Sequence, residues 1–191
     1  MTAIQRFRNA LQQLQVDEKV TIAIFEGYEN INDGAKKETR AAFFMQAMQR
    51  MNALMDDETR QAVRDACACS KEGWRLKAVQ KTARETAGQS LEEKLQALGQ
   101  IKYMGKPVLN ADGTITAGIG DEGGFECPCP VFNGLGLKET VSATYCYCCA
   151  GHFRFHYQIA LGKKLVTQAV VSSILDSGGE KPCRFVYAIV N

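Results

Sequence analysis

The chain has 191 residues, of which 46% are hydrophobic, so it can bury a core without disulfides or other cross-links. Its 23 Lys and Arg residues nearly balance 21 Asp and Glu residues, which gives a formal net charge of +2. This balance gives no reason to expect nucleic acid or an anionic membrane as a partner. The apolar runs are far shorter than the ~20 residues that a membrane span needs. The N-terminal residues are too polar for the core of a signal peptide. We therefore expect a cytoplasmic protein with reduced thiols.

The first half of the chain has the periodicity of helices. Apolar residues recur at helical spacing, and turn or capping residues separate one stretch from the next. Asp17 and Asp56, for example, are typical of helix N-termini. The sequence predicts helices over residues 2–14, 17–29, 36–55, 56–67, 72–86 and 90–99.

The second half changes toward the period of two that is typical of strands. Residues 108–109 and 114–116 predict a β-hairpin with a four-residue turn. The elements expected after it are a loop over 118–136, a strand over 139–149, a short helix over 151–161, and strands over 164–175 and 183–190. N-terminal helices followed by a mostly antiparallel sheet with a short crossover helix indicate an α+β fold. We expect a helical region over residues 1–100 and a cysteine-rich α+β region over 101–191, packed as one compact unit.

The eight cysteines are the most informative feature of the sequence, because six of them form Cys-x-Cys pairs. The pairs are Cys67 with Cys69, Cys127 with Cys129, and Cys146 with Cys148, and the other two are Cys149 and Cys183. In an extended segment, residues i and i+2 point to the same side. In a reducing compartment, such pairs are typical of metal-binding or redox-active thiols.

Two of these pairs could together complete a four-thiolate zinc site. Prolines on either side of Cys129 favour a rigid, extended presentation of Cys127 and Cys129. Cys146 and Cys148 would supply the second pair, and four thiolates suit tetrahedral zinc. Buried free thiols at strand ends are the alternative. Cys67 and Cys69 sit at a predicted helix end, where they could be alternative ligands, resolving thiols or apolar filler.

The two histidines of the chain, His152 and His156, lie four residues apart on the predicted helix over 151–161. This spacing places both side chains on one face and is compatible with metal binding or with a helix face packed on the sheet. His152 is closer to the cysteines and is the better candidate for a metal ligand or a proton shuttle. A cysteine activated by a nearby histidine is a further interpretation.

Residues 118–123 match the pattern Gly-x-Gly-x-x-Gly, but they do not indicate a dinucleotide site. A dinucleotide fingerprint needs a helix directly after it, whereas Gly124 and the Cys-Pro-Cys-Pro segment follow here. A structural loop or a lid is the expected use. Asp121 and Glu122 are candidate polar groups over a pocket.

A longer pattern in the C-terminal part adds a family resemblance. Cys146-x-Cys148-x-x-Gly151 is followed by Leu161-Gly162, by Ser177-Gly178-Gly179 and by Cys183-x-Phe185. This pattern resembles L-2-amino-thiazoline-4-carboxylate hydrolase-like proteins, which are related to 4-vinyl-reductase-type small-molecule-binding domains. The resemblance extends over residues 67–191.

The resemblance implies an α+β fold related to the haem-NO-binding and 4-vinyl reductase superfamily. It also implies a homodimer, a pocket between helices and sheet that takes a small-molecule ligand or substrate, and zinc held by cysteines. The implied reaction is C–N hydrolysis of a small cyclic amidine or thiazoline. The attacking group would be a cysteine thiolate or a zinc-bound water. We expect Cys146 or Cys148 as the reactive sulfur and His152 as the acid or base.

Two other functions remain open at this point. In a non-catalytic ligand-binding or sensor domain, the cysteines would hold a closed structural zinc, which has no open position for water. In a thiol redox switch, Cys67 and Cys69 would act against the other cysteine pairs.

Overall fold

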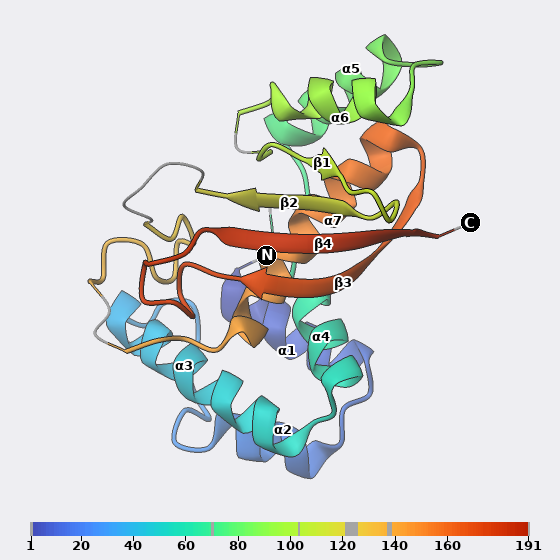
Figure 1. Ribbon diagram of the computed structural model, residues 1–191. Helices are drawn as coiled ribbons and strands as arrows, with labels where there is room; N and C mark the ends of the chain where they lie inside the picture. The colour runs from blue at the N-terminus through green and yellow to red at the C-terminus, as the bar shows by residue number, and fades with distance from the viewer. Residues whose placement is uncertain (1, 70, 103, 121–125, 137–138, 191) are drawn as a thin grey trace.

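The computed structural model describes residues 2–69, 71–102, 104–120, 126–136 and 139–190. They form an α+β fold, as the sequence predicts, with helices in the first half and an antiparallel sheet in the second (Figure 1). The helices are α1 (Ala3–Gln13), α2 (Glu18–Phe25), α3 (Lys37–Leu54), α4 (Asp57–Ala66), α5 (Trp74–Glu85), α6 (Leu91–Gly99) and α7 (Tyr147–Leu161), and a 3-10 turn, η1 (Ala143–Cys146), precedes α7.

Local capping explains why the predicted helix starts are confirmed. The Asp17 carboxylate accepts hydrogen bonds from the amides at the start of α2, and Asp56 accepts one from the Thr59 amide at the start of α4. Ser90 and Glu93 form a reciprocal capping box at the start of α6. Each cap satisfies backbone donors that the first turn of a helix leaves unpaired.

The sheet contains β1 (Val108–Leu109), β2 (Ile115–Ile119), β3 (Lys164–Ser172) and β4 (Cys183–Val190). The strand order is β1-β2-β4-β3, and each neighbouring pair is antiparallel. The predicted hairpin is confirmed: the Asn110 amide donates to the Thr114 carbonyl at 2.8 Å, and Gly113 takes a φ of 81° in the turn. A positive φ of this kind is accessible to glycine at little cost.

The strand predicted over residues 139–149 is wrong. The Ser142 hydroxyl accepts a hydrogen bond from the Thr144 amide at 3.2 Å and starts η1, which continues directly into α7. Thr144, Tyr145 and Cys146 are all buried, so burial does not alternate as it would along a strand. The helix therefore begins at Tyr147 rather than at 151, and Cys146, Cys148 and Cys149 lie on helical turns.

Helix α7 connects the parts of the fold. In Figure 1 it runs behind the sheet, with α1 to α4 on one side and α5 and α6 on the other. The Tyr187 hydroxyl of β4 donates to the Ala150 carbonyl of α7 at 2.9 Å. Arg154 of α7 forms an ion pair with Asp65 of α4. A cluster of buried apolar side chains extends from α1 through α7 to β4. Among the described helices, none combines the length and the apolar character required to cross a membrane.

Candidate active site

A cavity of about 910 Å³ opens against the N-terminal turns of α7. Its volume is at the upper end of the range of roughly 300–1,000 Å³ that is typical of small-molecule sites. Helix α7 contributes Cys148, Cys149, His152 and Phe153 to the wall. The rest of the described wall comes from α1, the loop between α2 and α3, α3, α4, α5, the segment from the end of α6 to β1, the end of β2, the Pro128–Val131 loop and η1.

Cys148 is the thiol in this cavity with thiolate character. A hydrogen bond from Cys149 and the positive charges of Arg64 and Arg6 lower the pKa of Cys148 to about 6, against the opposing effect of burial. Its place in the first turn of α7 acts in the same direction, because a helix N-terminus stabilises negative charge. The same hydrogen bond raises the pKa of Cys149, which keeps its proton and donates it toward Cys148. Cys148 is therefore ionised at neutral pH.

Arg64 is the charged partner that balances this thiolate. The side chain is only 2% exposed, and its Nη2 donates to the Tyr145 carbonyl at 3.1 Å. The guanidinium also lies over the Tyr145 ring, 4.5 Å from its centroid. Within the described part of the chain, Arg64 forms no ion pair with a carboxylate, and its Nε has no hydrogen-bond partner. A buried cation needs a compensating anion, and Cys148 supplies one.

His152 lies one helical turn after Cys148, on the same face of α7. Its Nδ1 is 2.7 Å from the Cys69 carbonyl oxygen. Because a carbonyl can only accept, Nδ1 carries the proton and Nε2 keeps its lone pair. Burial lowers the pKa of His152 to about 4, so the ring is neutral at pH 7. His156 is fully buried, with its ring centroid 4.7 Å from that of His152, and it is not among the described residues that line the cavity.

The structure distinguishes between Cys146 and Cys148, the two alternatives for the reactive sulfur. Cys148 lines the cavity, whereas Cys146 does not. Burial raises the pKa of Cys146, with Cys183 as a neighbour. Cys149 also lines the cavity; it follows Cys148 directly on α7, and the two thiols share a hydrogen bond.

The remaining cysteines are protonated thiols wherever a shift is resolved. Cys129 lines the cavity with its Sγ 3.2 Å from the Tyr145 hydroxyl, and burial raises its pKa. Burial raises the pKa of Cys127 to about 12. Cys67 and Cys69, at the end of α4, both line the cavity, and the Cys67 thiol donates to the Val63 carbonyl at 3.2 Å.

Cys127, Cys129, Cys146 and Cys148 lie in one part of the molecule: Cys148 raises the pKa of the other three, Cys129 raises that of Cys127, and Cys127 raises that of Cys146. Among the described residues, however, no group of three or more His, Cys, Asp or Glu side chains is arranged to hold a metal ion. The four-thiolate zinc site stays a prediction, and no chemical step below depends on it.

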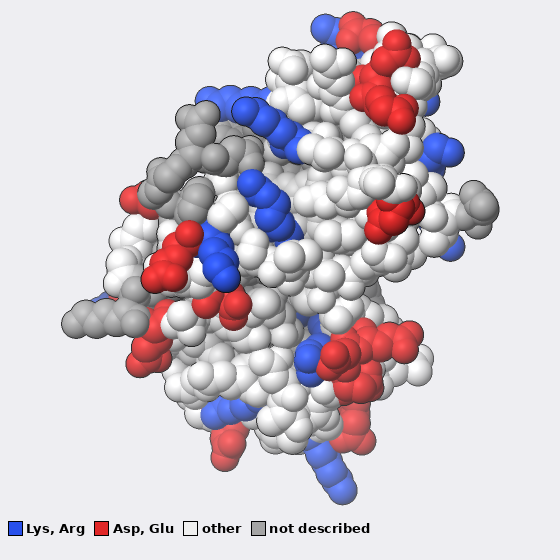
Figure 2. All heavy atoms as spheres, in the orientation of Figure 1, with Lys and Arg blue, Asp and Glu red and all other residues white. Residues whose placement is uncertain are grey.

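Positive charge dominates the cavity wall. Four arginines and two lysines line its described part: Arg6, Arg40, Arg64, Arg75, Lys102 and Lys106. Asp33 is the one carboxylate among the described lining residues, and it already accepts hydrogen bonds from the Thr2 hydroxyl and the Ile4 amide. Several Lys and Arg side chains lie close together over the segment after α6 and the strands below it (Figure 2). This charge surplus favours an anionic ligand.

The arginines are the part of the site that sequence reasoning missed. Arg64 carried a usable signal, because it stands beside Val63 and three residues before Cys67, on the apolar stripe of an otherwise polar helix. Arg6, Arg40 and Arg75 had no comparable signal in the sequence, because they come from three different helices and only the fold brings them to one cavity. Asp121 and Glu122, which the sequence suggested as polar groups over a pocket, lie outside the described residues.

No family model matches this chain, and no curated protein or solved structure is significantly similar to it. The resemblance to the hydrolase-like proteins, the homodimer and the cytoplasmic location therefore stay predictions. The geometry defines a cavity whose described wall is rich in cationic side chains and carries an ionised cysteine.

Proposed function

We propose that the protein is a cysteine-dependent hydrolase that opens a small cyclic amidine or thiazoline bearing an anionic group. One observation carries the proposal: the ionised Cys148 lies in a cationic cavity, beside the buried Arg64 and one turn before the neutral His152. A thiolate is a strong nucleophile, and a neutral imidazole can accept a proton from water.

In the first half of the reaction, the Cys148 sulfur bonds to the amidine carbon, and the electron pair of the C=N bond moves onto nitrogen. The bond from that carbon to its ring heteroatom then breaks. The departing atom keeps the electron pair and takes a proton from solvent. As that bond breaks, the electron pair on the other nitrogen re-forms the C=N bond, so a covalent thioimidate remains on Cys148.

In the second half, water attacks the same carbon while Nε2 of His152 accepts its proton. The electron pair of the C=N bond moves onto nitrogen, which takes the proton that His152 accepted. The new hydroxyl then loses its proton to solvent and becomes a carbonyl as the carbon–sulfur bond breaks, and Cys148 leaves as a thiolate. The low pKa of Cys148 helps this step, because a stable thiolate is a good leaving group. The positive charge of Arg64 stabilises both the attacking and the departing thiolate.

Paired variants test the proposal. We expect Cys148→Ser to lower turnover of 2-amino-thiazoline-4-carboxylate by about 100-fold or more, since the nucleophile is lost. Cys146→Ser should retain most of the activity, because Cys146 lies outside the cavity wall. Loss of activity in Cys146→Ser with retention in Cys148→Ser would contradict the assignment. A wild-type protein that binds this compound without converting it would favour a ligand-binding module.

A further inference from the structure

Five of the eight cysteines line the same cavity. Three segments of the chain contribute them: the residues after α4, the Pro128–Val131 loop and the first turn of α7. These thiols are Cys67, Cys69, Cys129, Cys148 and Cys149. The reaction proposed above uses the Cys148 sulfur and leaves the other four without a role. Thiols gathered around one thiolate are an arrangement in which sulfur redox chemistry occurs.

Cys148 is the thiol in this group that an oxidant attacks first. Hydroperoxides oxidise a thiolate to a sulfenic acid, and the thiolates that face a space open to small molecules are the most susceptible. Cys148 is ionised and lies on the cavity wall. Burial raises the pKa of Cys67 and of Cys129, so both keep their protons at neutral pH. Oxidation should therefore begin at Cys148.

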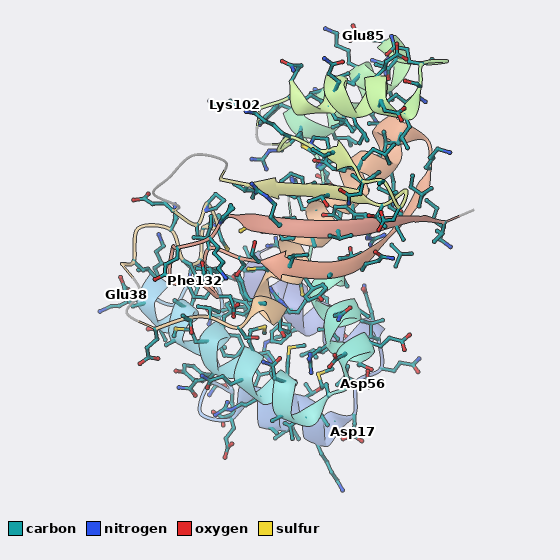
Figure 3. The ribbon with its side chains drawn as sticks, viewed as in Figure 1. Asp17, Glu38, Asp56, Glu85, Lys102 and Phe132 are labelled. Carbon is teal, nitrogen blue, oxygen red and sulfur yellow. The ribbon has the colours of Figure 1, made fainter. Side chains whose placement is uncertain are left out.

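The loop that carries Cys129 is held against the residues that lead into α7. The Cys129 Sγ is 3.2 Å from the Tyr145 hydroxyl. Figure 3 labels Phe132 on the same loop, and the Phe132 ring meets the Tyr145 ring edge-on with centroids 4.8 Å apart. Tyr145 lies in η1, three residues before Cys148. After burial, the charge of Cys148 is the largest influence that raises the pKa of Cys129. Cys129 is thus a neighbour of Cys148 on the cavity wall.

Two other thiols of the wall are poorer disulfide partners for Cys148. Cys149 is the next residue of α7, and consecutive Cα atoms are about 3.8 Å apart, below the lower limit of about 4.4 Å that is usual for disulfides. A bond between these two would distort the first turn of the helix. Cys67 is 4% exposed, and its thiol donates to the Val63 carbonyl. Cys69 is the competitor that an experiment must separate from Cys129.

We propose that Cys148 is a site of reversible oxidation by hydroperoxides and that Cys129 resolves the oxidised form as a disulfide. In the first step, the Cys148 thiolate bonds to the terminal oxygen of the hydroperoxide, and the O–O bond breaks. The departing alkoxide takes a proton from solvent and leaves as an alcohol, while Cys148 becomes a sulfenic acid.

In the second step, the Cys129 sulfur bonds to the Cys148 sulfur, and the S–O bond breaks. The hydroxyl of the sulfenic acid takes the proton of the Cys129 thiol and leaves as water. The two cysteines together lose two electrons, which reduce the hydroperoxide. An added dithiol returns both to thiols by exchange. This chemistry does not need the proposed hydrolysis, although the disulfide would remove the nucleophile on which that hydrolysis depends.

Peptide mapping of the oxidised wild-type protein tests the proposal. Fully reduced protein is treated with one equivalent of hydrogen peroxide, the remaining thiols are alkylated, and disulfides are located by mass spectrometry. We expect a bond between Cys129 and Cys148 as the main product, a loss of two free thiols, and full recovery with dithiothreitol.

A pair of serine variants tests the role of Cys129. In Cys129→Ser, the sulfenic acid on Cys148 has lost its partner, so its labelling by dimedone should rise by about fivefold or more over the wild type. Cys183→Ser is the matched control, because Cys183 is buried and is not among the described residues that line the cavity. It should form the same disulfide as the wild type.

A Cys148 that stays reduced under these conditions would overturn the proposal, and so would a main disulfide from Cys148 to Cys69 or Cys149. The wild-type map decides this even if Cys129→Ser fails to fold. The proposed function fails separately: a reduced protein that leaves 2-amino-thiazoline-4-carboxylate unchanged but forms the Cys129–Cys148 bond with peroxide would have the redox pair without the hydrolase.

Discussion

Gly151 of α7 lies against Asp65 of α4 so closely that a Cβ at position 151 would come within 2.8 Å of the Asp65 carbonyl oxygen. The Asp65 carboxylate also pairs with Arg154, one turn along α7. These contacts hold α4 and α7 together beside the site. Arg64 is the residue directly before Asp65 on α4, and Cys148 lies three residues before Gly151 on α7. The electrostatic partnership of Arg64 with Cys148 therefore depends on the absence of a side chain at position 151.

We expect Gly151→Ala to destabilise the fold by about 1–3 kcal/mol, because the backbone of α4 must move to admit the methyl group. The same movement should raise the pKa of Cys148 as Arg64 withdraws. Denaturant unfolding measures the first effect, and the pH dependence of alkylation measures the second. Gly99→Ala is the control, since its Cβ would meet its nearest neighbour at 3.7 Å. Equal stability of the two variants would contradict the close contact.

The reactivity of Cys148 should show its lowered pKa. Only the thiolate reacts with iodoacetamide, so the rate of Cys148 modification should rise with pH to a half-maximum near its pKa of about 6. Cys127, with a pKa of about 12, should remain nearly unreactive at neutral pH. Peptide mapping by mass spectrometry separates the two sites. A half-maximum between pH 8 and pH 9 for Cys148 would show that the thiol is not activated.

Arg64→Met keeps much of the buried side-chain volume and removes the charge. We expect the pKa of Cys148 to rise and its alkylation rate at pH 7 to fall by about 10-fold, because the thiolate loses a cation that stabilises it. Arg60→Met is the matched control in the same helix, where Arg60 pairs with Asp57 at the surface. If Arg64→Met alkylates like the wild type, the charge of Arg64 does not tune Cys148.

His152 should make the protein less stable in acid. Burial lowers its pKa from 6.5 to about 4, so between these values the unfolded chain binds a proton that the folded chain does not. The free energy of unfolding should therefore fall by roughly 3 kcal/mol as the pH drops from 6.5 to 4. His152→Asn cannot titrate and should lose that part of the pH dependence. An unchanged slope in the variant would show that other groups account for the acid sensitivity.

The zinc proposal predicts one zinc per chain and about four thiols that become titratable only after a chelator is added. Elemental analysis of protein purified without affinity metal, with a thiol titration, measures both. No zinc and eight reactive thiols after unfolding would overturn it. A zinc ion held by Cys148 would also block alkylation of that sulfur, so the zinc site and the nucleophile cannot both use Cys148 at the same time.

Local sequence determined most of the secondary structure, because the deciding contacts are short in range. The carboxylates of Asp17 and Asp56 and the Ser90–Glu93 box cap the helices within a few residues, and Asn110 closes its hairpin with Thr114. The strand predicted over residues 139–149 is wrong for a related reason. Its aromatic and cysteine residues favour a strand by propensity, but burial on every side of Tyr145 and the cap at Ser142 select a helix.

By itself, then, the sequence determined the α+β fold class and identified the cysteines and His152 as candidate groups. Only the tertiary structure decided that Cys148, rather than Cys146, lies at the cavity, and that Arg64 is buried beside it. The physical reason is that a thiol's pKa depends on the charges and the dielectric within a few ångströms. Those charges come from α1 and α4, roughly eighty residues and more away along the chain, and only the packing of helices brings them to α7.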